Sequence, residues 1–421
     1  MADFLGDNNT EQLLDFDMAG TLVIIGAGQA AGQLLASLAQ DGFPGAVTLV
    51  GDEPHPPYQR PPLSKKFLAG EIELDRLYMK PAAFYEKAGA ALRLGTPVER
   101  IDRPSRTIVL ADGERLTYAT LVIATGSRPR RLPLPGADLA GIFYLRTIAD
   151  VAAIRARFVP GASLAVVGGG YIGLELAAVA VKQGLRVTVF EAAPRLMARG
   201  VGPVVSRFFA RLHREEGAVV HTDAKVLGFE GNGTVERVAC EGASCPADIV
   251  VIGTGALPNV ELAAQAGLAV EDGIAVDAHC RTDDPAIYAI GDCTSQFHAL
   301  AERRLRLESV HNALEQGRIA AAAICGRPPP AIQVPWFWSD QYDVKLQMVG
   351  LSAGHDEAVV RGDPELGRSF AVFYRRDGVL IAVDAVNRAP EFMVSKRLIA
   401  ERARIDPARL SDERLTMKDL R

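Results

Sequence analysis

Two glycine-rich turns are the residues of this chain whose types and spacing point to the most definite chemistry. The first reads Gly26-Ala-Gly28-Gln-Ala-Ala31 and joins an apolar, strand-like stretch to a helix-like one. A glycine at the first position allows a tight turn, a glycine at the third lets the backbone approach a pyrophosphate, and a small sixth residue lets helix and strand pack closely. The helix N-terminus adds free N–H groups for the phosphates. The pattern predicts a dinucleotide site, with Asp52, just past the next strand, bonded to a ribose hydroxyl.

The second turn, Gly168-Gly-Gly170-Tyr-Ile-Gly173, repeats this arrangement 142 residues later. A further pair of segments repeats as well, because LVIATGSRP at residues 121–129 resembles IVVIGTGALPN at residues 249–259. One such glycine pattern is weak evidence, and glycine turns in ordinary parallel α/β units are the alternative. Two patterns in the same strand–turn–helix context indicate two similar dinucleotide-binding domains. Two dinucleotides in one chain suggest FAD in one domain and a nicotinamide in the other.

The acid that follows the second turn favours NAD over NADP. Glu191 ends the next strand, 23 residues after Gly168. Its carboxylate can accept hydrogen bonds from a ribose 2′-hydroxyl and would repel a 2′-phosphate. Ala192 and Ala193 supply no cation to reverse this preference. Arg195 and Arg199 lie further on, where we expect them to meet the pyrophosphate or the adenosine.

The order of these segments predicts an α/β protein with two Rossmann-like domains of the glutathione-reductase type and a small C-terminal α+β domain. A Pro-rich linker at residues 327–335 precedes the last domain, in which short apolar strands alternate with turns before a basic helix. The expected parts are a mobile arm, a discontinuous FAD-binding domain, an NAD-binding domain and the C-terminal domain. Their predicted ranges are 1–19, 20–145 with 262–335, 146–261 and 336–421, respectively.

The bulk composition bounds the class of protein. Of 421 residues, 48% are hydrophobic and 23% charged, with a formal net charge of −5, which is typical of a globular chain and gives no sign of a nucleic-acid binder. No apolar stretch is long enough to cross a bilayer. The first nineteen residues are acidic, unlike a leader, so we expect a cytoplasmic protein, either a monomer or a weak dimer. The seven histidines show no metal-ligand spacing, so no metal site is expected.

Five cysteines do not suggest a disulfide framework. Cys240 and Cys245 have the C-x4-C spacing of a redox-active pair. Disulfide reductases carry that pair on the first helix after the FAD-binding strands, whereas these two lie in a stretch that reads as a strand and turn, residues 235–247. We therefore interpret the spacing as coincidence, since a motif counts only in its structural context.

Six motifs, in order, carry a resemblance to a known family: PPYQRPPLSK, LVIATGSRPR, VVGGGYIGLE, AIYAIGDC, ESVHNALEQG and VPWFWSDQY. Together they resemble the putidaredoxin-reductase type of ferredoxin reductase, a flavoprotein family whose architecture Rieske-oxygenase ferredoxin reductases and apoptosis-inducing factor share. The resemblance covers nearly the whole chain after Ala19. The later stretch VDAVNRAPEF resembles reductases that serve cysteine-ligated haem monooxygenases more than those that serve dioxygenases.

The resemblance also implies individual site residues. It places Lys65 near the flavin ring, Trp338 beside the isoalloxazine, and Glu175 near the nicotinamide carboxamide and paired with Lys65. These three are the candidate catalytic residues. The implied FAD contacts are Gly26, Gly28, Ala31, Asp52, Arg60, Lys65, Val98, Ala124, Thr125, Gly126, Arg128, Gly291, Asp292, Val310 and Trp338. The implied NAD contacts are Gly168, Gly170, Ile172, Gly173, Glu191, Arg199 and Gly255.

The implied activity is that of an FAD-dependent NADH–ferredoxin reductase. A hydride passes from NADH to FAD, and single electrons then pass to an acidic [2Fe–2S] ferredoxin of an oxygenase system, with a haem monooxygenase favoured over a Rieske dioxygenase. A ferredoxin of this kind needs a basic docking surface, for which the candidates are Arg318, Lys345, Arg388, Lys396 and Arg397.

Other interpretations stay open on the sequence. Arg60 and Lys65 could be surface charges, Glu175 a solvated helix residue, and Trp338 simple core. The basic C-terminal helix could be only a solvated face. An NADH-dependent peroxidase or disulfide reductase would carry a reactive cysteine in residues 61–70, which contain none. A signalling flavoprotein would call for a targeting leader and basic nucleic-acid surfaces.

Overall fold

The computed structural model describes residues 20–420, so the predicted arm at residues 1–19 lies outside the described residues. Two compact units make up the described chain. Unit 1 holds the described part of Met1–Gln59 together with Asp75–Ser127 and Pro258–Ile332. Unit 2 holds Arg60–Leu74, Arg128–Leu257 and the described part of Gln333–Arg421.

A parallel five-stranded sheet forms the centre of unit 1. Its strand order is β19-β7-β1-β2-β3, with bounds Ile287–Ala289, Thr120–Ile123, Leu22–Ile25, Val47–Gly51 and Ala90–Leu94. Every residue of β1 is buried, and the strand reads Leu-Val-Ile-Ile. Such a continuous apolar run is what a parallel strand needs when both faces of its sheet are covered.

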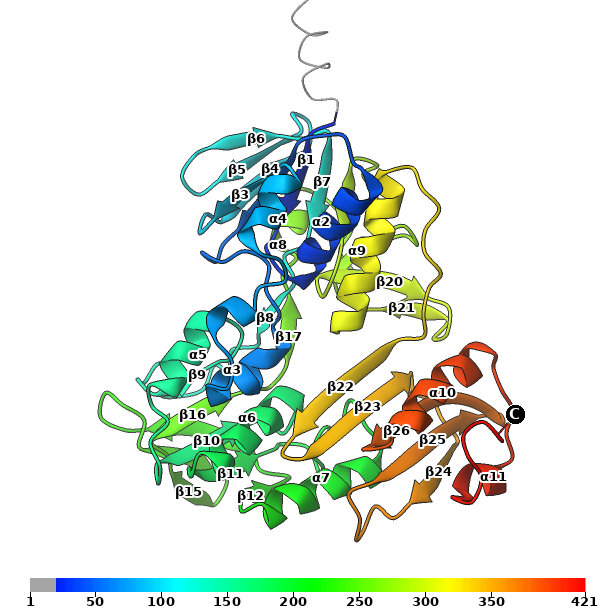
Figure 1. Ribbon diagram of the computed structural model, residues 1–421. Helices are drawn as coiled ribbons and strands as arrows, with labels where there is room; N and C mark the ends of the chain where they lie inside the picture. Colours follow the sequence, from blue (N-terminus) through cyan, green and yellow to red (C-terminus); the bar gives the residue numbers. More distant parts are fainter. Residues whose placement is uncertain (1–19, 421) are drawn as a thin grey trace, which may run out of the picture. The chain divides into compact units, whose positions relative to one another are not determined.

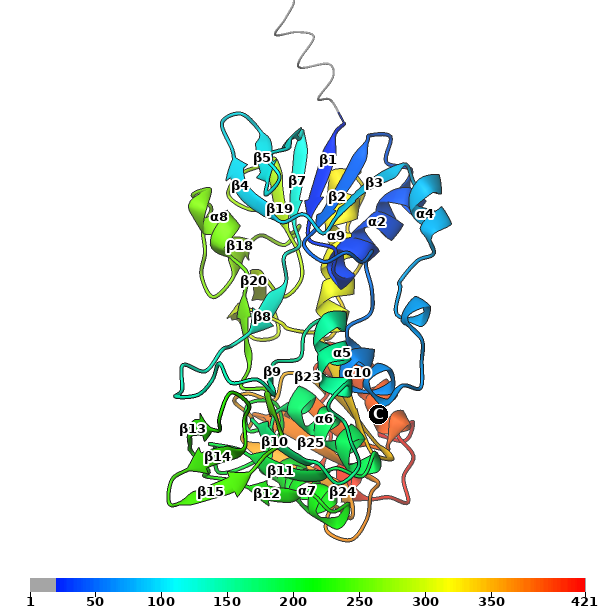
Figure 2. The ribbon, with the colours of Figure 1, turned by 90° about the vertical axis from the view of Figure 1, so that its left-hand side faces the viewer.

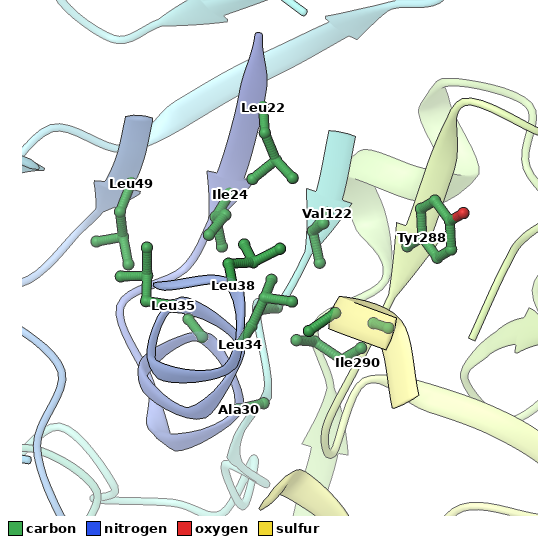
Figure 3. Close-up of a cluster of buried hydrophobic side chains, with 14 of the residues drawn as sticks. Leu22, Ile24, Ala30, Leu34, Leu35, Leu38, Leu49, Val122, Tyr288 and Ile290 are labelled. Atoms are coloured by element: carbon green, nitrogen blue, oxygen red, sulfur yellow. The ribbon is translucent and has the colours of Figure 1, made fainter. Parts of the chain in front are cut away.

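Helices α2 (Gln29–Asp41) and α9 (Val310–Ile324) lie side by side on one face of this sheet (Figures 1 and 2). Leu34, Leu35 and Leu38 of α2 point toward Ile24 and Val122 of the strands (Figure 3). Burying these side chains stabilises the unit by about 25 cal/mol for each Å² removed from water. The two helices approach closely, because a Cβ at Gly317 of α9 would lie 2.9 Å from a carbonyl oxygen of α2.

Smaller elements complete unit 1. A second apolar cluster, which includes Ile101, Ile108, Tyr118 and Ile274, packs beneath the other face of the sheet. One small antiparallel sheet consists of β4 (Val98–Asp102), β5 (Thr107–Leu110) and β6 (Arg115–Thr117), and another small sheet of β18 (Ile274–Val276), β20 (Thr294–His298) and β21 (Arg303–Leu305). The short helices are α4 (Ala82–Lys87), α8 (Glu261–Gln265) and η2 (Leu74–Arg76), whose first residue belongs to unit 2.

Unit 2 contains a second parallel sheet of the same kind, in the order β12-β11-β10-β16-β9. Its strands are Val219–His221, Arg186–Phe190, Ser163–Val167, Ile249–Ile252 and Ile142–Phe143. Its helices are α5 (Ile148–Arg155), α6 (Tyr171–Lys182) and α7 (Pro203–Glu215), and a three-stranded antiparallel sheet is formed by β13 (Val226–Glu230), β14 (Arg237–Cys240) and β15 (Ala243–Pro246).

The C-terminal part of unit 2 is an antiparallel sheet in the order β22-β23-β26-β25-β24. The strands are Trp336–Gln341, Val344–Gly350, Val379–Val386, Phe370–Arg376 and Glu357–Gly362, and α10 (Ala389–Ala400) and α11 (Pro407–Ser411) pack against the sheet (Figure 1). The segment η1 (Pro61–Ser64) and α3 (Lys66–Ala69) also belong to unit 2. The remaining short strands, β8 (Ser127–Pro129) and β17 (Ala256–Pro258), pair with each other where the chain passes between the units.

The predicted fold class is confirmed: each unit is built on a Rossmann-like parallel sheet, and an α+β part ends the chain. The strands that precede the two glycine turns, β1 and β10, end directly before Gly26 and Gly168, as the strand–turn–helix pattern predicts. The described chain forms two compact units, and residues 60–74 belong to unit 2. The predicted boundaries between domains therefore stay a prediction.

Candidate functional site

The two glycine turns have the same backbone geometry. Gly26 and Gly168 hold φ angles of +108° and +110°, which only glycine adopts readily. A Cβ at Gly26 would lie 2.3 Å from the carbonyl oxygen of Ala124, and one at Gly168 would lie 2.5 Å from that of Gly253. A glycine is therefore required at both positions, because the chain turns tightly against the neighbouring strand.

The second glycine of each turn faces open space. No atom lies within 4 Å of a Cβ built at Gly28, and the nearest to one at Gly170 is 3.9 Å away. Each of these residues is the N-cap of a long helix, α2 or α6, and neither helix has a side-chain cap. The open space next to uncapped N–H groups fits a phosphate, since a helix N-terminus attracts anions.

The sixth position of each turn serves packing. A Cβ at Gly173 would lie 2.4 Å from the carbonyl oxygen of Gly168, so this glycine lets α6 approach its strand. Ala31 has the same place in the first turn and is completely buried. Its methyl group is tolerated there, as expected for a small residue at the sixth position.

Glu191 is held in place by the second glycine turn. Its Oε2 accepts a hydrogen bond from the backbone N–H of Gly169 at 2.7 Å, and its Oε1 accepts one from Ala193 at 2.8 Å. The carboxylate thus lies directly beside the turn, in a fixed orientation, at the edge where a ribose is expected.

The two arginines beyond Glu191 differ. Both guanidinium Nη atoms of Arg195 donate to carbonyl oxygens of its own loop, those of Val201 and Ala198. Arg195 therefore holds its own loop in shape, and its expected contact with the cofactor stays a prediction. Arg199 is exposed, and its Nη2 would lie 2.9 Å from a Cβ at Gly255, so the absence of a side chain at Gly255 makes room for this cation.

In unit 1 a second group of predicted residues surrounds the end of the parallel sheet. The Thr125 hydroxyl donates to the carbonyl oxygen of Asn259 at 2.7 Å, and the Asn259 side-chain amide donates to the carbonyl oxygen of Thr125 at 2.8 Å. Next to them the Ser127 hydroxyl donates to Asp292 at 3.0 Å. Asp292 follows Gly291, whose φ of +84° turns the chain at the strand end.

The remaining predicted contacts lie in separate places. In unit 1 Asp52 is exposed after β2, Val98 begins β4, and Val310 begins α9. In unit 2 Arg60 donates from Nη1 to the carbonyl oxygen of Arg146 at 2.7 Å, and Ile172 leaves 47% of its surface exposed at the start of α6. Arg128 is exposed at the connection between the units.

The candidate catalytic pair is present in unit 2. Lys65 Nζ lies 2.6 Å from Glu175 Oε2, with 16% of the lysine side chain and 4% of the glutamate side chain exposed. Glu175 is therefore a buried, paired residue of α6, and the interpretation as a solvated helix residue is wrong. A buried carboxylate needs such partners because removal from water penalises its charge.

Two serines that the sequence analysis did not single out complete this cluster. The Ser64 hydroxyl donates to Glu175 Oε2 and the Ser339 hydroxyl donates to Glu175 Oε1, both at 2.6 Å. Both serines are buried. They lie inside the quoted motifs PPLSK and WFWSDQY, so a buried hydroxyl in each motif was the signal that could have identified them.

Aromatic side chains cluster on β22 in the same unit. The ring centroids of Trp336 and Trp338 are 5.5 Å apart, and both rings are half-buried, so neither is simple core. Lys396 Nζ lies 4.5 Å from the centroid of Trp336 and 4.3 Å from that of Phe392. Partial burial lowers the pKa of Lys396, whose ammonium group is held by the ring faces.

Comparison with known proteins gives the chain's relationships. Residues 20–317 match the family described as pyridine nucleotide-disulphide oxidoreductase, and residues 336–421 match the reductase C-terminal family. The chain is 43% identical to putidaredoxin reductase of Pseudomonas putida, over 95% of this chain and 96% of that protein. It is 42% identical to the ferredoxin–NAD(+) reductase component of the anthranilate 1,2-dioxygenase system of Burkholderia cepacia, over 95% and 99% of the two chains.

The structural comparison agrees. The crystal structure of the covalent putidaredoxin reductase–putidaredoxin complex matches with a TM-score of 0.93 at 42% identity, covering 95% of this chain and 98% of that one. This chain belongs to the pyridine nucleotide-disulphide oxidoreductase family. Within that family it is a reductase of the putidaredoxin-reductase type, as the sequence motifs predict. It is accordingly an FAD-dependent oxidoreductase that uses NAD(H), and the two open glycine turns fit two dinucleotides.

Neither a metal centre nor a membrane span is found in residues 20–420. No group of three or more His, Cys, Asp or Glu side chains there could hold a metal ion. No helix of that stretch is long and apolar enough to cross a membrane.

The C-x4-C pair of this reductase lies on the β14–β15 hairpin, as its strand-and-turn context predicts. Cys240 and Cys245 are both free thiols, and burial raises the pKa of Cys240, which disfavours the reactive thiolate. We expect Cys240→Ser/Cys245→Ser to leave NADH oxidation unchanged within roughly twofold, as for substitutions away from functional contacts. Reductive titration should show the same number of electrons taken up by the variant; a loss of two would reveal a working disulfide.

Proposed function

We propose that this reductase transfers a hydride from NADH to FAD and passes single electrons from the flavin to a small acidic [2Fe–2S] ferredoxin. The observation that carries the proposal is the Lys65–Glu175 ion pair, which joins the PPLSK segment to the helix that begins at the second glycine turn. FAD supplies the chemistry, since it accepts two electrons at once and can release them one at a time. The protein supplies binding, orientation and charge.

In this proposal the first turn and its surroundings hold FAD. Gly26, Gly28 and Ala31 form the turn, and Asp52 accepts bonds from a ribose. The other contacts proposed for FAD are Arg60, Lys65, Val98, Ala124, Thr125, Gly126, Arg128, Gly291, Asp292, Val310 and Trp338. Support for the group comes from the uncapped helix α2 and from the Thr125–Asn259 and Ser127–Asp292 hydrogen bonds, which hold the end of the sheet in one shape.

The second turn binds NADH in the same proposal. Gly168, Gly170 and Gly173 accommodate the pyrophosphate, and Glu191 accepts bonds from the adenosine ribose. Ile172 offers its exposed apolar surface, Arg199 a cation and Gly255 the room for that cation. Glu175 contacts the carboxamide end, and Lys65 supplies positive charge where reduction builds negative charge on the flavin.

The candidate docking residues for ferredoxin differ in how their charges are balanced. Arg388 pairs with Glu391 and Glu413, Arg397 with Glu401 at 3.6 Å, and Lys345 with Asp340 at 3.8 Å. These three charges are partly neutralised by their neighbours. Lys396 contacts aromatic rings instead of a carboxylate, and Arg318 of unit 1 is exposed. We therefore assign the largest steering effect in unit 2 to Lys396.

Charge reversal at the C-terminal helix tests this assignment. With Lys396→Glu/Arg397→Glu, we expect ferredoxin reduction at low salt to slow by roughly tenfold or more, because charges at the rim of an interface mainly set the association rate. Its salt dependence should also flatten, since ~0.15 M salt screens exposed charges beyond about 8 Å. Reduction of FAD by NADH should not change.

Lys396→Met is the matched control, because it removes the charge and keeps an unbranched side chain over Trp336 and Phe392. It should show part of the rate loss. Arg397→Glu alone should slow ferredoxin reduction less than Lys396→Glu alone, since Glu401 already balances the charge of Arg397. If the double reversal changed neither the rate nor the salt slope, α10 would be a solvated face and docking would have to be sought around Arg318 and Lys345.

We propose that the ferredoxin belongs to the electron-transfer system of a cysteine-ligated haem monooxygenase. The motif VDAVNRAPEF and the similarity to putidaredoxin reductase support this choice. The second candidate is a Rieske dioxygenase system, which the similarity to the anthranilate dioxygenase component favours. A peroxidase or disulfide reductase lacks support, because residues 61–70 contain no cysteine.

Stopped-flow kinetics with two mixing steps test the function as a whole. NADH should bleach the flavin absorbance of the purified protein, and ferredoxin added afterwards should restore it while becoming reduced itself. A panel of ferredoxins from haem monooxygenase and Rieske systems should then rank the two candidates. Rapid reoxidation by hydrogen peroxide or a disulfide, with no ferredoxin of the panel reacting, would contradict the proposal.

A further inference from the structure

A chain of buried hydrogen bonds leads away from Glu175 through unit 2. The Ser339 hydroxyl, which donates to Glu175 Oε1, accepts a bond from Gln341 Nε2 at 3.1 Å. Gln341 Oε1 lies 2.8 Å from His213 Nε2, and His213 Nδ1 lies 3.1 Å from the Tyr342 hydroxyl. Ser339, Gln341 and His213 each expose at most 1% of their surface. Buried polar groups linked in this way restrict one another strongly.

The orientation of the Gln341 amide follows from its neighbours. Ser339 has a single hydroxyl proton, which it donates in its hydrogen bond to Glu175. Ser339 can therefore only accept from Gln341, which places the amide nitrogen on the serine and the amide oxygen on His213. If the amide were turned over, its oxygen would face a serine oxygen with no proton left to donate.

The His213 ring is fixed for the same reason. The Gln341 oxygen requires the proton on Nε2, so Nδ1 accepts from the Tyr342 hydroxyl. Burial lowers the pKa of His213 to about 4, so the ring is neutral at neutral pH and keeps one donor and one acceptor. Tyr342 holds a φ of +56°, which a large side chain rarely adopts, and its ring packs edge-on against His213 at 5.0 Å.

All four donors therefore point the same way. Tyr342 donates to His213, His213 to Gln341, Gln341 to Ser339 and Ser339 to Glu175, so the positive ends of the dipoles face the carboxylate. The members come from α7, the β22–β23 turn, β22 and α6, and they converge on the residue that pairs with Lys65.

We propose that Ser339, Gln341 and His213 are positioning residues that hold the Glu175 carboxylate, and through it the Lys65 ammonium group, in one place for hydride transfer. This inference rests on the proposed function, which puts Lys65 beside the flavin. The aligned dipoles offset the negative charge of Glu175, so that the positive charge of Lys65 is available to the flavin as it becomes reduced.

Two variants interrupt the chain at different links. Ser339→Ala removes the donor to Glu175, and Gln341→Leu removes the donor to Ser339. Ser339→Ala should lower the limiting rate of FAD reduction at saturating NADH by about tenfold, the scale of one hydrogen bond to a charged group, and Gln341→Leu, which removes a bond between neutral groups, by about fivefold. Both should leave the NADH concentration for half-maximal rate within about twofold. The flavin midpoint potential, measured against reference dyes, should move to more negative values because offsetting dipoles are lost.

Rescue and coupling separate positioning from folding. Ser339→Thr keeps the hydroxyl and should restore both the rate and the potential. In a Glu175→Gln background, Gln341→Leu should have no further effect, since residues that act through one group are not additive. The matched control is Ser206→Ala, which removes another buried serine of unit 2 whose hydroxyl donates only to the Leu196 carbonyl oxygen. It should leave rate and potential unchanged.

Two results would overturn the inference. One is an unchanged rate and potential in folded Ser339→Ala and Gln341→Leu proteins that bind FAD. The other is an equal effect of Gln341→Leu with and without Glu175→Gln. Failure of the proposed function looks different, because the unmodified protein would then not bind FAD or its flavin would not be reduced by NADH.

Discussion

Replacing Lys65 with methionine is expected to slow the reduction of FAD by NADH by about 10²–10³-fold, the typical cost of removing one group that stabilises developing charge. Methionine keeps an unbranched side chain of nearly the same length and removes the ammonium group with its hydrogen bonds to Glu175 and the Pro61 carbonyl oxygen. The loss should appear in the limiting rate measured by stopped flow, with NADH binding little affected, because Lys65 acts on the charge that develops during the reaction.

The same variant should lose stability. Lys65→Met leaves the Glu175 carboxylate with Ser64 and Ser339 but without its ion-pair partner, and breaking a buried pair on one side costs about 3–5 kcal/mol. The control is Lys65→Met/Glu175→Gln, in which the buried charge is absent and most of the stability should return. Its flavin reduction should stay slow. Full recovery of the rate in this double variant would mean that Lys65 serves only to neutralise Glu175.

Exchanging the charges after the second glycine turn should shift the preference from NADH toward NADPH by roughly 10²-fold or more. Glu191→Ala/Ala192→Arg removes a carboxylate that would repel a 2′-phosphate and adds a cation that can bind it, and hydrogen bonds to charged groups are worth about 1.5–3 kcal/mol each. The measurement is the ratio of kcat/KM for the two cofactors with a fixed electron acceptor.

A ratio is needed because Glu191 also accepts hydrogen bonds from the backbone N–H groups of Gly169 and Ala193. Losing these bonds will loosen the turn and lower activity with both cofactors. Glu191→Gln is the control, since it removes the charge and keeps one acceptor oxygen. If the double variant discriminated as strongly as the unmodified protein, the adenosine ribose would have to bind elsewhere.

The glycine turns show how much the sequence by itself determined. Their pattern is local, because the residues for the tight turn, the open backbone and the close helix–strand contact lie within six positions of one another. The carbonyl oxygens that exclude a Cβ at Gly26 and Gly168 belong instead to Ala124 and Gly253, which are remote in sequence. Positive φ angles at Gly26 and Gly168, open space at Gly28 and close packing at Gly173 follow the predicted roles one by one. The fold class followed from the same repeat, since two such turns require two parallel sheets to position them.

The surroundings of Glu175 were decided only by the tertiary structure. Its hydrogen bonds to Lys65 and Ser339 span 110 and 164 residues of sequence, and no local pattern records which buried hydroxyl will meet which carboxylate. The family resemblance could suggest the Lys65–Glu175 pair, but Ser64, Ser339 and the chain to His213 depend on how four elements pack.

The docking surface for ferredoxin also could not be fully predicted from the sequence, for a different reason. The sequence shows five cations, and the folded chain shows that Glu401, Glu391, Glu413 and Asp340 partly neutralise three of them. Lys396 differs because the rings of Trp336 and Phe392, sixty and four residues before it, come to lie under its ammonium group. Electrostatic character depends on distances between side chains, and the tertiary structure decided those of Glu413 from Arg388 and of Trp336 from Lys396, pairs that lie 25 and 60 residues apart in the sequence.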